Sequence, residues 1–72
     1  MSNELMAMQT FLAVVEQQSF SAAARVLGVG QPSVSRRISD LEAHLETALL
    51  VRTTREVRPT EAGLRYYEAA RT

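Results

Sequence analysis

The sequence predicts a mainly helical domain in which three helices are followed by a short β-hairpin and a fourth helix. Apolar residues recur at helical spacing over Glu4–Gln18 and again over Gln31–Leu45, and a short alanine-rich segment that ends at a glycine lies between them. After Thr47 the pattern changes to the alternation of a half-buried strand and then returns to helical spacing. These three observations predict the fold class.

The first helix is predicted over Glu4–Gln18. Its apolar positions are Leu5, Met8, Phe11, Leu12 and Val15. Met6 and Met8 are interpreted as core filler, because methionine at helical spacing serves packing more often than binding. The pattern breaks over Gln17–Ser19, and Phe20 is expected to be an anchor that packs this loop onto the first and third helices.

Two helical signals separated by a glycine turn occupy Ser19–Leu45 and indicate a helix-turn-helix. Ser21 can cap the first of the two helices, and the three alanines that follow favour helix and allow another helix to approach closely. Gly28 supplies the positive φ that ends this helix. The second helix begins near Gln31, because Pro32 suits the first helical turn, where its missing N–H is not needed.

The helix predicted over Gln31–Leu45 has an inner stripe and an outer face. On a helical wheel at about 100° per residue, the stripe consists of Val34, Ile38, Leu41 and Leu45. Arg36 points away from the stripe, and Ser33 and Ser35 flank the outer face near the helix N-terminus, where free N–H groups and the positive dipole end suit a phosphate. This first half is interpreted as a DNA-reading segment. The acidic second half, from Glu42, is expected to have left the phosphate backbone.

A short two-stranded wing is predicted over residues 50–58. Val57 stands between polar neighbours, as a half-buried strand requires. Pro59 cannot donate a ladder hydrogen bond, so the second strand must be an edge strand or must end there. Arg52 and Arg55 would then lie at the base and the tip of the hairpin, where arginine can contact phosphates or enter a minor groove. A solvated hairpin without DNA contacts is the alternative.

A last helix is predicted over Glu61–Arg71, with Thr60 as its cap and Gly63 as a weakening residue. Its apolar stripe consists of Leu64, Tyr67 and Ala70. A domain of this size has a core near the lower limit for folding alone, and association would help it. We therefore expect two copies to pair through this stripe as a homodimer, and the helix is expected to continue beyond the chain.

Composition limits the classes of function. The chain has 72 residues and a net charge of zero, so its charge must be considered by position. All eight basic residues are arginines, and six of them lie within residues 25–58. The absence of cysteine fits a reducing compartment, and no apolar run approaches the roughly 20 residues that cross a bilayer. We expect a soluble cytoplasmic protein with no membrane partner.

Two other classes of function are weighed against DNA binding. An enzyme is disfavoured because the chain lacks the residues of a catalytic site: it has one histidine, His44, no cysteine, no glycine-rich phosphate loop and no paired acids. We also expect no metal and no cofactor. A small helical interaction module that dimerises and does not bind DNA fits the zero net charge better. Against it stands the placement of arginines and serines around one helix N-terminus and the neighbouring hairpin. Salt-dependent binding to duplex DNA would discriminate the two.

Several motifs occur together along the chain, namely Phe11–Glu16, Ser19–Ala24, Leu27, Val29, Gln31–Arg36, Ile38, Leu41–Glu42, Leu49, Arg52, Arg55 and Thr60–Gly63. In these motifs the chain resembles the N-terminal DNA-binding domain of LysR-type transcriptional regulators, over nearly its whole length. The resemblance implies a winged helix-turn-helix over residues 1–59, followed at 60–72 by the start of a linker helix through which two chains pair. It also implies a bacterial, cytoplasmic protein that is nucleoid-associated when bound to double-stranded DNA. A small-molecule effector would act only through a C-terminal domain outside this chain.

Carried over by position, the resemblance implies two sets of DNA contacts. The groove and phosphate contacts are Gln31, Pro32, Ser33, Ser35 and Arg36, with Ser21 and the backbone beside it as a phosphate anchor. The wing contacts are Arg52 and Arg55. Four positions depart from the family pattern, namely Gly30, Glu46, Leu50 and Pro59, where serine, glycine, phenylalanine and leucine are common. These departures affect the cap of the third helix and the geometry of the wing.

Overall fold

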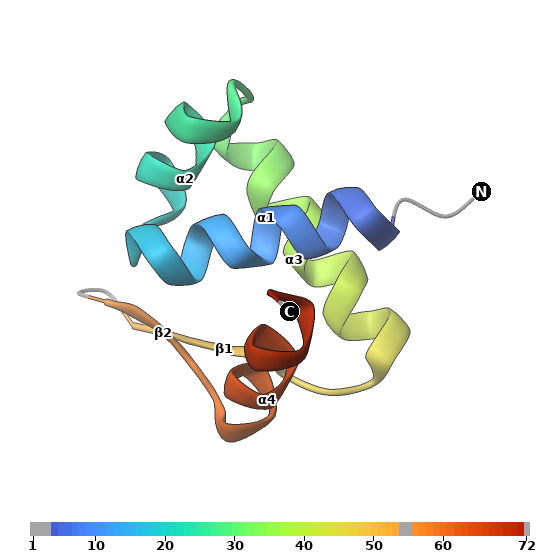
Figure 1. The fold of residues 1–72 in the computed structure, drawn as a ribbon. Coiled ribbons are helices and arrows are strands. Elements are labelled where there is room, and N and C mark those ends of the chain that lie inside the picture. The colour runs from blue at the N-terminus through green and yellow to red at the C-terminus, as the bar shows by residue number, and fades with distance from the viewer. Residues whose placement is uncertain (1–3, 54–55, 72) are drawn as a thin grey trace.

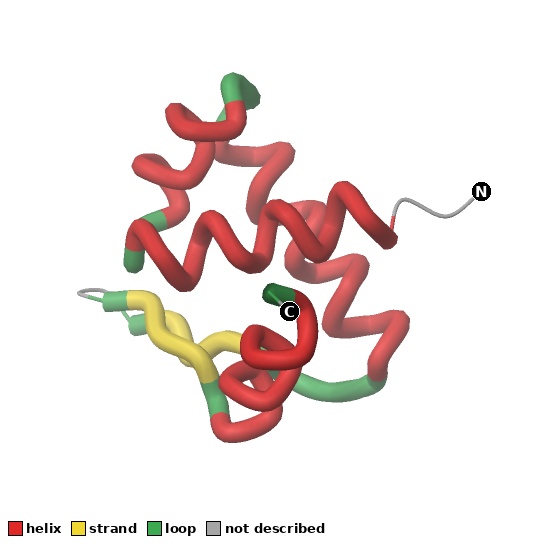
Figure 2. Tube along the Cα trace, in the orientation of Figure 1, coloured by secondary structure: helices red, strands yellow, loops and turns green. Residues whose placement is uncertain are grey.

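The computed structural model describes residues 4–53 and 56–71, and within them it contains four helices and one hairpin. The elements follow in the order α1 (Glu4–Gln17), α2 (Phe20–Leu27), α3 (Gln31–Leu45), β1 (Leu50–Arg52), β2 (Val57–Pro59) and α4 (Glu61–Ala70). α1 lies across the middle of the molecule, with α2 on one side and the hairpin and α4 on the other (Figure 1). Helices account for most of the chain (Figure 2). The predicted fold class is confirmed.

The core lies where α1, α2 and α3 meet and the start of the hairpin closes over them. Its fully buried apolar side chains are Phe11, Val14, Ala23, Val34 and Ile38. Ala24 is also buried, because a small side chain lets α2 approach its neighbours closely. The predicted inner stripe of α3 is confirmed as far as Leu41, whereas Leu45 in the last turn is 38% exposed.

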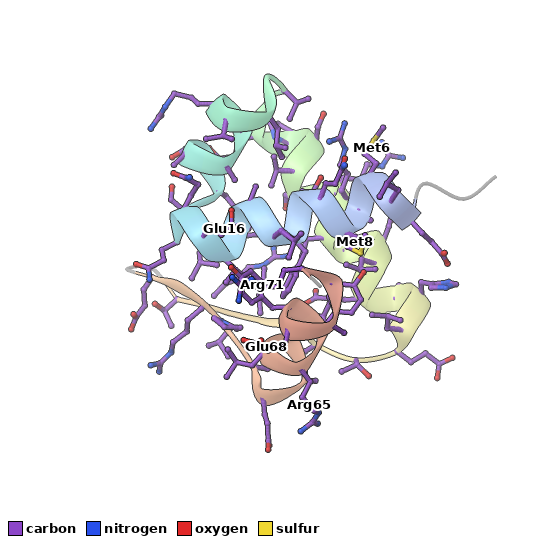
Figure 3. All side chains as sticks on the ribbon, viewed as in Figure 1. Met6, Met8, Glu16, Arg65, Glu68 and Arg71 are labelled. Atoms are coloured by element: carbon purple, nitrogen blue, oxygen red, sulfur yellow. The ribbon has the colours of Figure 1, made fainter. Side chains whose placement is uncertain are left out.

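The first turn of α1 does not belong to the core. Leu5 is 63% exposed and Met6 is 42% exposed, so the predictions that Leu5 lies on the buried face and that Met6 fills the core are wrong. Met6 and Met8 lie on opposite sides of α1 (Figure 3), and Met8 is half-buried. The core contacts of this helix begin only at Ala7. Thr10 is buried instead, and its hydroxyl donates a 2.8 Å hydrogen bond to the Met6 carbonyl, which removes the cost of burying it.

The cap of α2 is Ser19 and not Ser21. Ser19 has extended backbone angles, and its hydroxyl accepts a 3.1 Å hydrogen bond from the Ala22 N–H. Gln18, at φ 56°, turns the chain just before it, so the helix begins earlier than the sequence predicts. Phe20 is therefore the first helical residue and not part of a loop. Ser21 remains exposed in the first turn, with its hydroxyl 3.1 Å from that of Ser19.

The turn between α2 and α3 has the predicted form. Gly28 ends α2 at φ 72°, a left-handed conformation that favours glycine. α3 begins at Gln31 after Gly30, which caps it without a side-chain hydrogen bond, and Pro32 occupies the first turn. At the other end Glu46 adopts φ 53°, which costs a non-glycine residue about 1 kcal/mol. The departure at position 46 therefore strains the end of α3 without moving it.

The hairpin is antiparallel, and Leu50 pairs with Pro59, Val51 with Arg58 and Arg52 with Val57. The second strand ends at Pro59, and as one of two strands it is an edge strand, where proline is tolerated. The wing thus extends one residue beyond the predicted range of 50–58. Arg55, which the sequence places at the wing tip, lies outside the described residues.

α4 begins against the peptide that precedes the wing. Thr60 caps it as predicted, because its hydroxyl accepts a 2.9 Å hydrogen bond from the Gly63 N–H. The same hydroxyl donates to the Ala48 carbonyl at 2.8 Å, and the Thr60 N–H donates to the Leu49 carbonyl at 3.0 Å. Gly63 is buried, and a Cβ at this position would overlap the Leu49 carbonyl oxygen. Glycine is needed here for close approach, although by propensity it weakens the helix.

Two tyrosines join α4 to α1. The ring of Tyr66 packs edge-on against Phe11, with the ring centroids 5.4 Å apart. The Tyr67 hydroxyl donates a 3.2 Å hydrogen bond to the Glu16 carboxylate. Partial loss of water contact, followed by the hydrogen bond to Glu16, raises the pKa of Tyr67, and burial followed by the charge of Glu4 raises the pKa of Tyr66. Both shifts favour the protonated phenol, which is the form in which Tyr67 donates to Glu16.

Candidate nucleic-acid interface

A groove lies between the N-terminal halves of α2 and α3 and the wing. Its lining residues are Gln18, Ser19, Phe20, Ser21, Gln31, Ser35, Arg52, Thr53, Glu56 and Val57. Four of the residues that the sequence selects share this groove, namely Ser21, Gln31, Ser35 and Arg52. Hydroxyl, amide and guanidinium donors from three elements therefore face one open channel, as recognition of a phosphate backbone requires.

The outer face of α3 lies beside this groove. Pro32, Ser33 and Arg36 are exposed there, while Val34 and Ile38 on the opposite face are completely buried. The cap of α3 is a glycine without a side chain, so no side-chain oxygen covers the positive end of the helix dipole. This end of α3 is open to a negatively charged group.

Adjacent arginines on α3 have different environments. Within residues 4–53 and 56–71, Arg36 has no ion-pair or hydrogen-bond partner. Arg37 is half-buried, and its guanidinium donates a 3.3 Å hydrogen bond to the buried hydroxyl of Thr10. Arg36 is thus available to a ligand, whereas Arg37 joins α3 to α1.

Arg52 is held in place at the base of the wing. Its guanidinium carbon lies 4.7 Å from the centre of the Phe20 ring, within the range of a cation–π interaction. Its Nη2 lies 3.9 Å from Oε1 of Glu42. Prediction from sequence placed Arg52 beside DNA but identified neither of these two partners.

Glu42 is the main residue that sequence reasoning missed. Its Oε2 accepts hydrogen bonds from the Leu49 N–H at 2.7 Å and from the Leu50 N–H at 3.1 Å. The available signal is its spacing, since Glu42 follows Ile38 by four residues and so lies at the edge of the buried stripe. An acid in that position faces the core and needs donors.

Other site chemistries find no support in the described part of the chain. No cluster of three potential metal ligands occurs among those residues. His44 is 64% exposed, in keeping with the predicted solvated position, and its Nε2 lies 3.1 Å from a carboxylate oxygen of Glu4. None of the described helices is long and apolar enough to span a bilayer.

Comparison with known families gives a match over residues 5–64 to the family described as "Bacterial regulatory helix-turn-helix protein, lysR family". The chain belongs to the LysR family. An uncharacterized HTH-type transcriptional regulator of Haemophilus influenzae is 46% identical to this LysR domain over 66 residues, which are 92% of the chain and 23% of the relative. The chain thus spans less than a quarter of that relative. The family places the chain among transcriptional regulators and not among enzymes.

Solved structures of LysR-family proteins share the fold. The BenM DNA-binding domain, solved with catB site 1 DNA, superimposes with a TM-score of 0.89 at 44% identity, covering 92% of this chain and 73% of that one. The CbnR DNA-binding domain, also solved with DNA, gives a TM-score of 0.89 at 39% identity and covers 92% and 76% of the two chains. The winged helix-turn-helix architecture is therefore that of LysR DNA-binding domains.

Proposed function

We propose that this LysR domain binds double-stranded DNA, with the first half of α3 in the major groove and the wing on the phosphate backbone. The observation that carries the proposal is the groove in which Ser21, Gln31, Ser35 and Arg52 meet beside the exposed outer face of α3. The DNA complexes of the BenM and CbnR domains support it, because their fold is the same. The alternative of an interaction module without DNA binding leaves this convergence of donors unexplained.

The contacting residues divide by the kind of contact they can make. Gln31, Pro32, Ser33 and Arg36 lie at the exposed start of α3, where base edges and the rim of the groove come within reach. Ser21, Ser35, Arg52 and Arg55 are proposed as backbone contacts. Hydroxyls and arginines suit phosphate oxygens, and such contacts position the protein without selecting a sequence.

Removing Arg52 is expected to weaken binding to every duplex by a similar factor. Each phosphate contact releases about one counterion, so Arg52→Ala should reduce the slope of log K against log salt by roughly 0.9. Fluorescence anisotropy titrations of a mixed-sequence duplex at several salt concentrations measure that slope. Arg65→Ala is the matched control, because Arg65 is exposed on α4 and pairs with Glu61 at 3.4 Å. Equal slopes for the two variants would contradict backbone contact by the wing.

The second part of the proposal concerns pairing and the whole protein. We propose that residues 1–59 form the DNA-binding unit and that 60–72 begin a linker helix through which two copies pair by Leu64, Tyr67 and Ala70. Leu64 supports it, because this leucine is 51% exposed on α4. A two-fold pair would present two copies of α3 to half-sites about one helical turn apart, or a multiple of that distance. We also propose that the protein is located in the bacterial cytoplasm and on the nucleoid when it is bound to DNA. A further domain would sense the effector.

Leu64→Asp is expected to shift the chain toward monomer, because it places a charge on the proposed seam. Sedimentation velocity at several protein concentrations measures the shift, and circular dichroism checks that the helices remain. Val26→Asp is the control, because Val26 is an apolar residue on α2 that is 63% exposed. Tyr67→Asp would be ambiguous, since the Tyr67 phenol also bonds to Glu16 within the chain. An unchanged oligomeric state for folded Leu64→Asp would exclude this seam.

A further inference from the structure

We infer that Glu42 is a positioning residue for DNA binding, which holds the base of the wing against α3 and aims Arg52 into the groove. The inference rests on the proposed function, since Arg52 is there a phosphate contact. Glu42 itself touches no DNA in this account. Its carboxylate connects the helix that enters the major groove to the hairpin that contacts the backbone.

The carboxylate binds two consecutive peptide N–H groups at the start of the wing. Oε2 accepts from Leu49 at 2.7 Å and from Leu50 at 3.1 Å. Hydrogen bonds to an ionised acceptor are stronger than those between neutral groups. The position of this short segment relative to α3 is therefore set by one side chain and not only by the loop that joins them.

The wing needs such an external attachment. Each of its strands has three residues, and an isolated two-stranded hairpin is marginally stable in water. Leu50 and Pro59 form a pair that exchanges no ladder hydrogen bond, because the bonded pairs lie on either side of it, as in the Thr60 N–H bond to the Leu49 carbonyl. The Leu50 N–H therefore points away from β2, and Glu42 supplies its partner.

The location of Glu42 in α3 is otherwise unfavourable. A carboxylate in the last turns of a helix faces the negative end of the helix dipole, and this side chain is only 21% exposed. Both costs require compensation by hydrogen-bond donors or positive charge. The two N–H groups compensate by hydrogen bonds and the Arg52 guanidinium, 3.9 Å away, by its opposite charge. The acid is therefore better explained by the wing than by the helix.

The same contact determines where Arg52 points. Residues two apart in a strand share a face, so Arg52 projects to the side on which Leu50 is buried, toward α2 and α3. There the guanidinium lies over Phe20, and its Nη2 lies 3.9 Å from Oε1 of Glu42. Guanidinium has five N–H donors, so these contacts orient it and leave donors for a phosphate.

The peptide that Glu42 holds is also held from its other side. The Leu49 N–H bonds to Glu42, while the Leu49 carbonyl accepts from the Thr60 N–H at 3.0 Å. The side chain of Leu49 is almost completely buried. The base of the wing is thus fixed between α3 and α4, and Glu42 is its attachment to α3.

The first test uses the free protein and the substitution Glu42→Gln. The glutamine oxygen can still accept from the two N–H groups, but its NH₂ group cannot attract Arg52. Glu46→Gln is the matched control, because Glu46 is an exposed residue at the end of α3 and the net charge changes equally. In NMR spectra the side-chain protons of Arg52, shifted by the Phe20 ring, should move toward unstacked values only in Glu42→Gln. Unchanged Arg52 shifts in that variant would overturn the inference.

The second test measures affinity for a mixed-sequence duplex at low salt. Glu42→Gln should bind about five- to tenfold more weakly than Glu46→Gln, although both variants lose one negative charge. In an Arg52→Ala background the two variants should bind within about twofold of each other. Equal affinities of the two variants in the parent background would overturn the positioning role. Failure of the parent chain to bind any duplex would overturn the proposed function, while the NMR test would still decide whether Glu42 positions Arg52.

Discussion

Gly63→Ala is expected to destabilise the domain by about 2 kcal/mol or more, the upper part of the range for overpacked cores. The added methyl group would overlap the Leu49 carbonyl oxygen, which belongs to backbone and cannot rotate away. Relief requires α4 to move from the base of the wing, and this movement would break the 3.0 Å hydrogen bond between the Thr60 N–H and that carbonyl. For a domain of this size the loss corresponds to a fall in Tm of at least about 8 °C.

Thermal and urea unfolding followed by circular dichroism measure the change, and Ala69→Gly provides the control. Ala69 is exposed in the same helix, so its replacement reports helix propensity alone and should cost up to about 1 kcal/mol. By propensity alone, Gly63→Ala would stabilise by a similar amount. The sign of the Gly63→Ala effect therefore distinguishes close packing from helix propensity, and Ala69→Gly gives the size of the propensity effect. A more stable Gly63→Ala protein would show that close approach to Leu49 does not matter.

Features decided by local chemistry could be predicted from the sequence. α3 begins at its predicted residue because Gly28 ends the preceding helix and Pro32 lies in the first turn of the next one. Thr60 caps α4 because a hydroxyl just before a helix can accept from an N–H three residues later. Such signals need no knowledge of what packs against the helix.

Features decided by contacts between distant segments could not be predicted. A helical wheel places Glu42 at the edge of the buried stripe, but nothing in its window indicates that the N–H groups of Leu49 and Leu50 will face it. Gly63 looks like a defect in its helix until the Leu49 carbonyl is placed beside it. The choice of Ser19 over Ser21 as cap depends on Gln18 adopting a positive φ, for which glutamine gives no signal.

In the candidate site too, the features set by local periodicity could be predicted, whereas those set by packing between distant segments could not. The outward direction of Arg36 follows from helical periodicity, and its exposure confirms that part. That Ser21, Gln31 and Arg52 share one groove depends on how the wing lies beside the starts of α2 and α3, which helical periodicity does not indicate. Their role as DNA contacts stays a prediction.

Arg36→Ala is expected to cost about 1 to 3 kcal/mol in binding free energy at a duplex selected by the parent chain from a random pool. Arg36 is exposed on the outer face of α3, and within the described residues its guanidinium has no partner. A planar fork of donors matches the O6 and N7 acceptors of guanine, so the loss should be larger on the selected duplex than on mixed sequence. Anisotropy titrations on both duplexes measure the difference.

Two further variants determine which contact Arg36 makes. Arg65→Ala removes the same charge from α4 (Figure 3) and should leave the preference between the duplexes unchanged. Arg36→Lys keeps the charge but loses the fork, so it should behave like Arg36→Ala on the selected duplex if Arg36 binds a guanine edge. Equal weakening by Arg36→Ala on both duplexes, with full rescue by lysine, would instead make Arg36 a phosphate contact. Affinity equal to that of Arg65→Ala on both duplexes would remove Arg36 from the interface altogether.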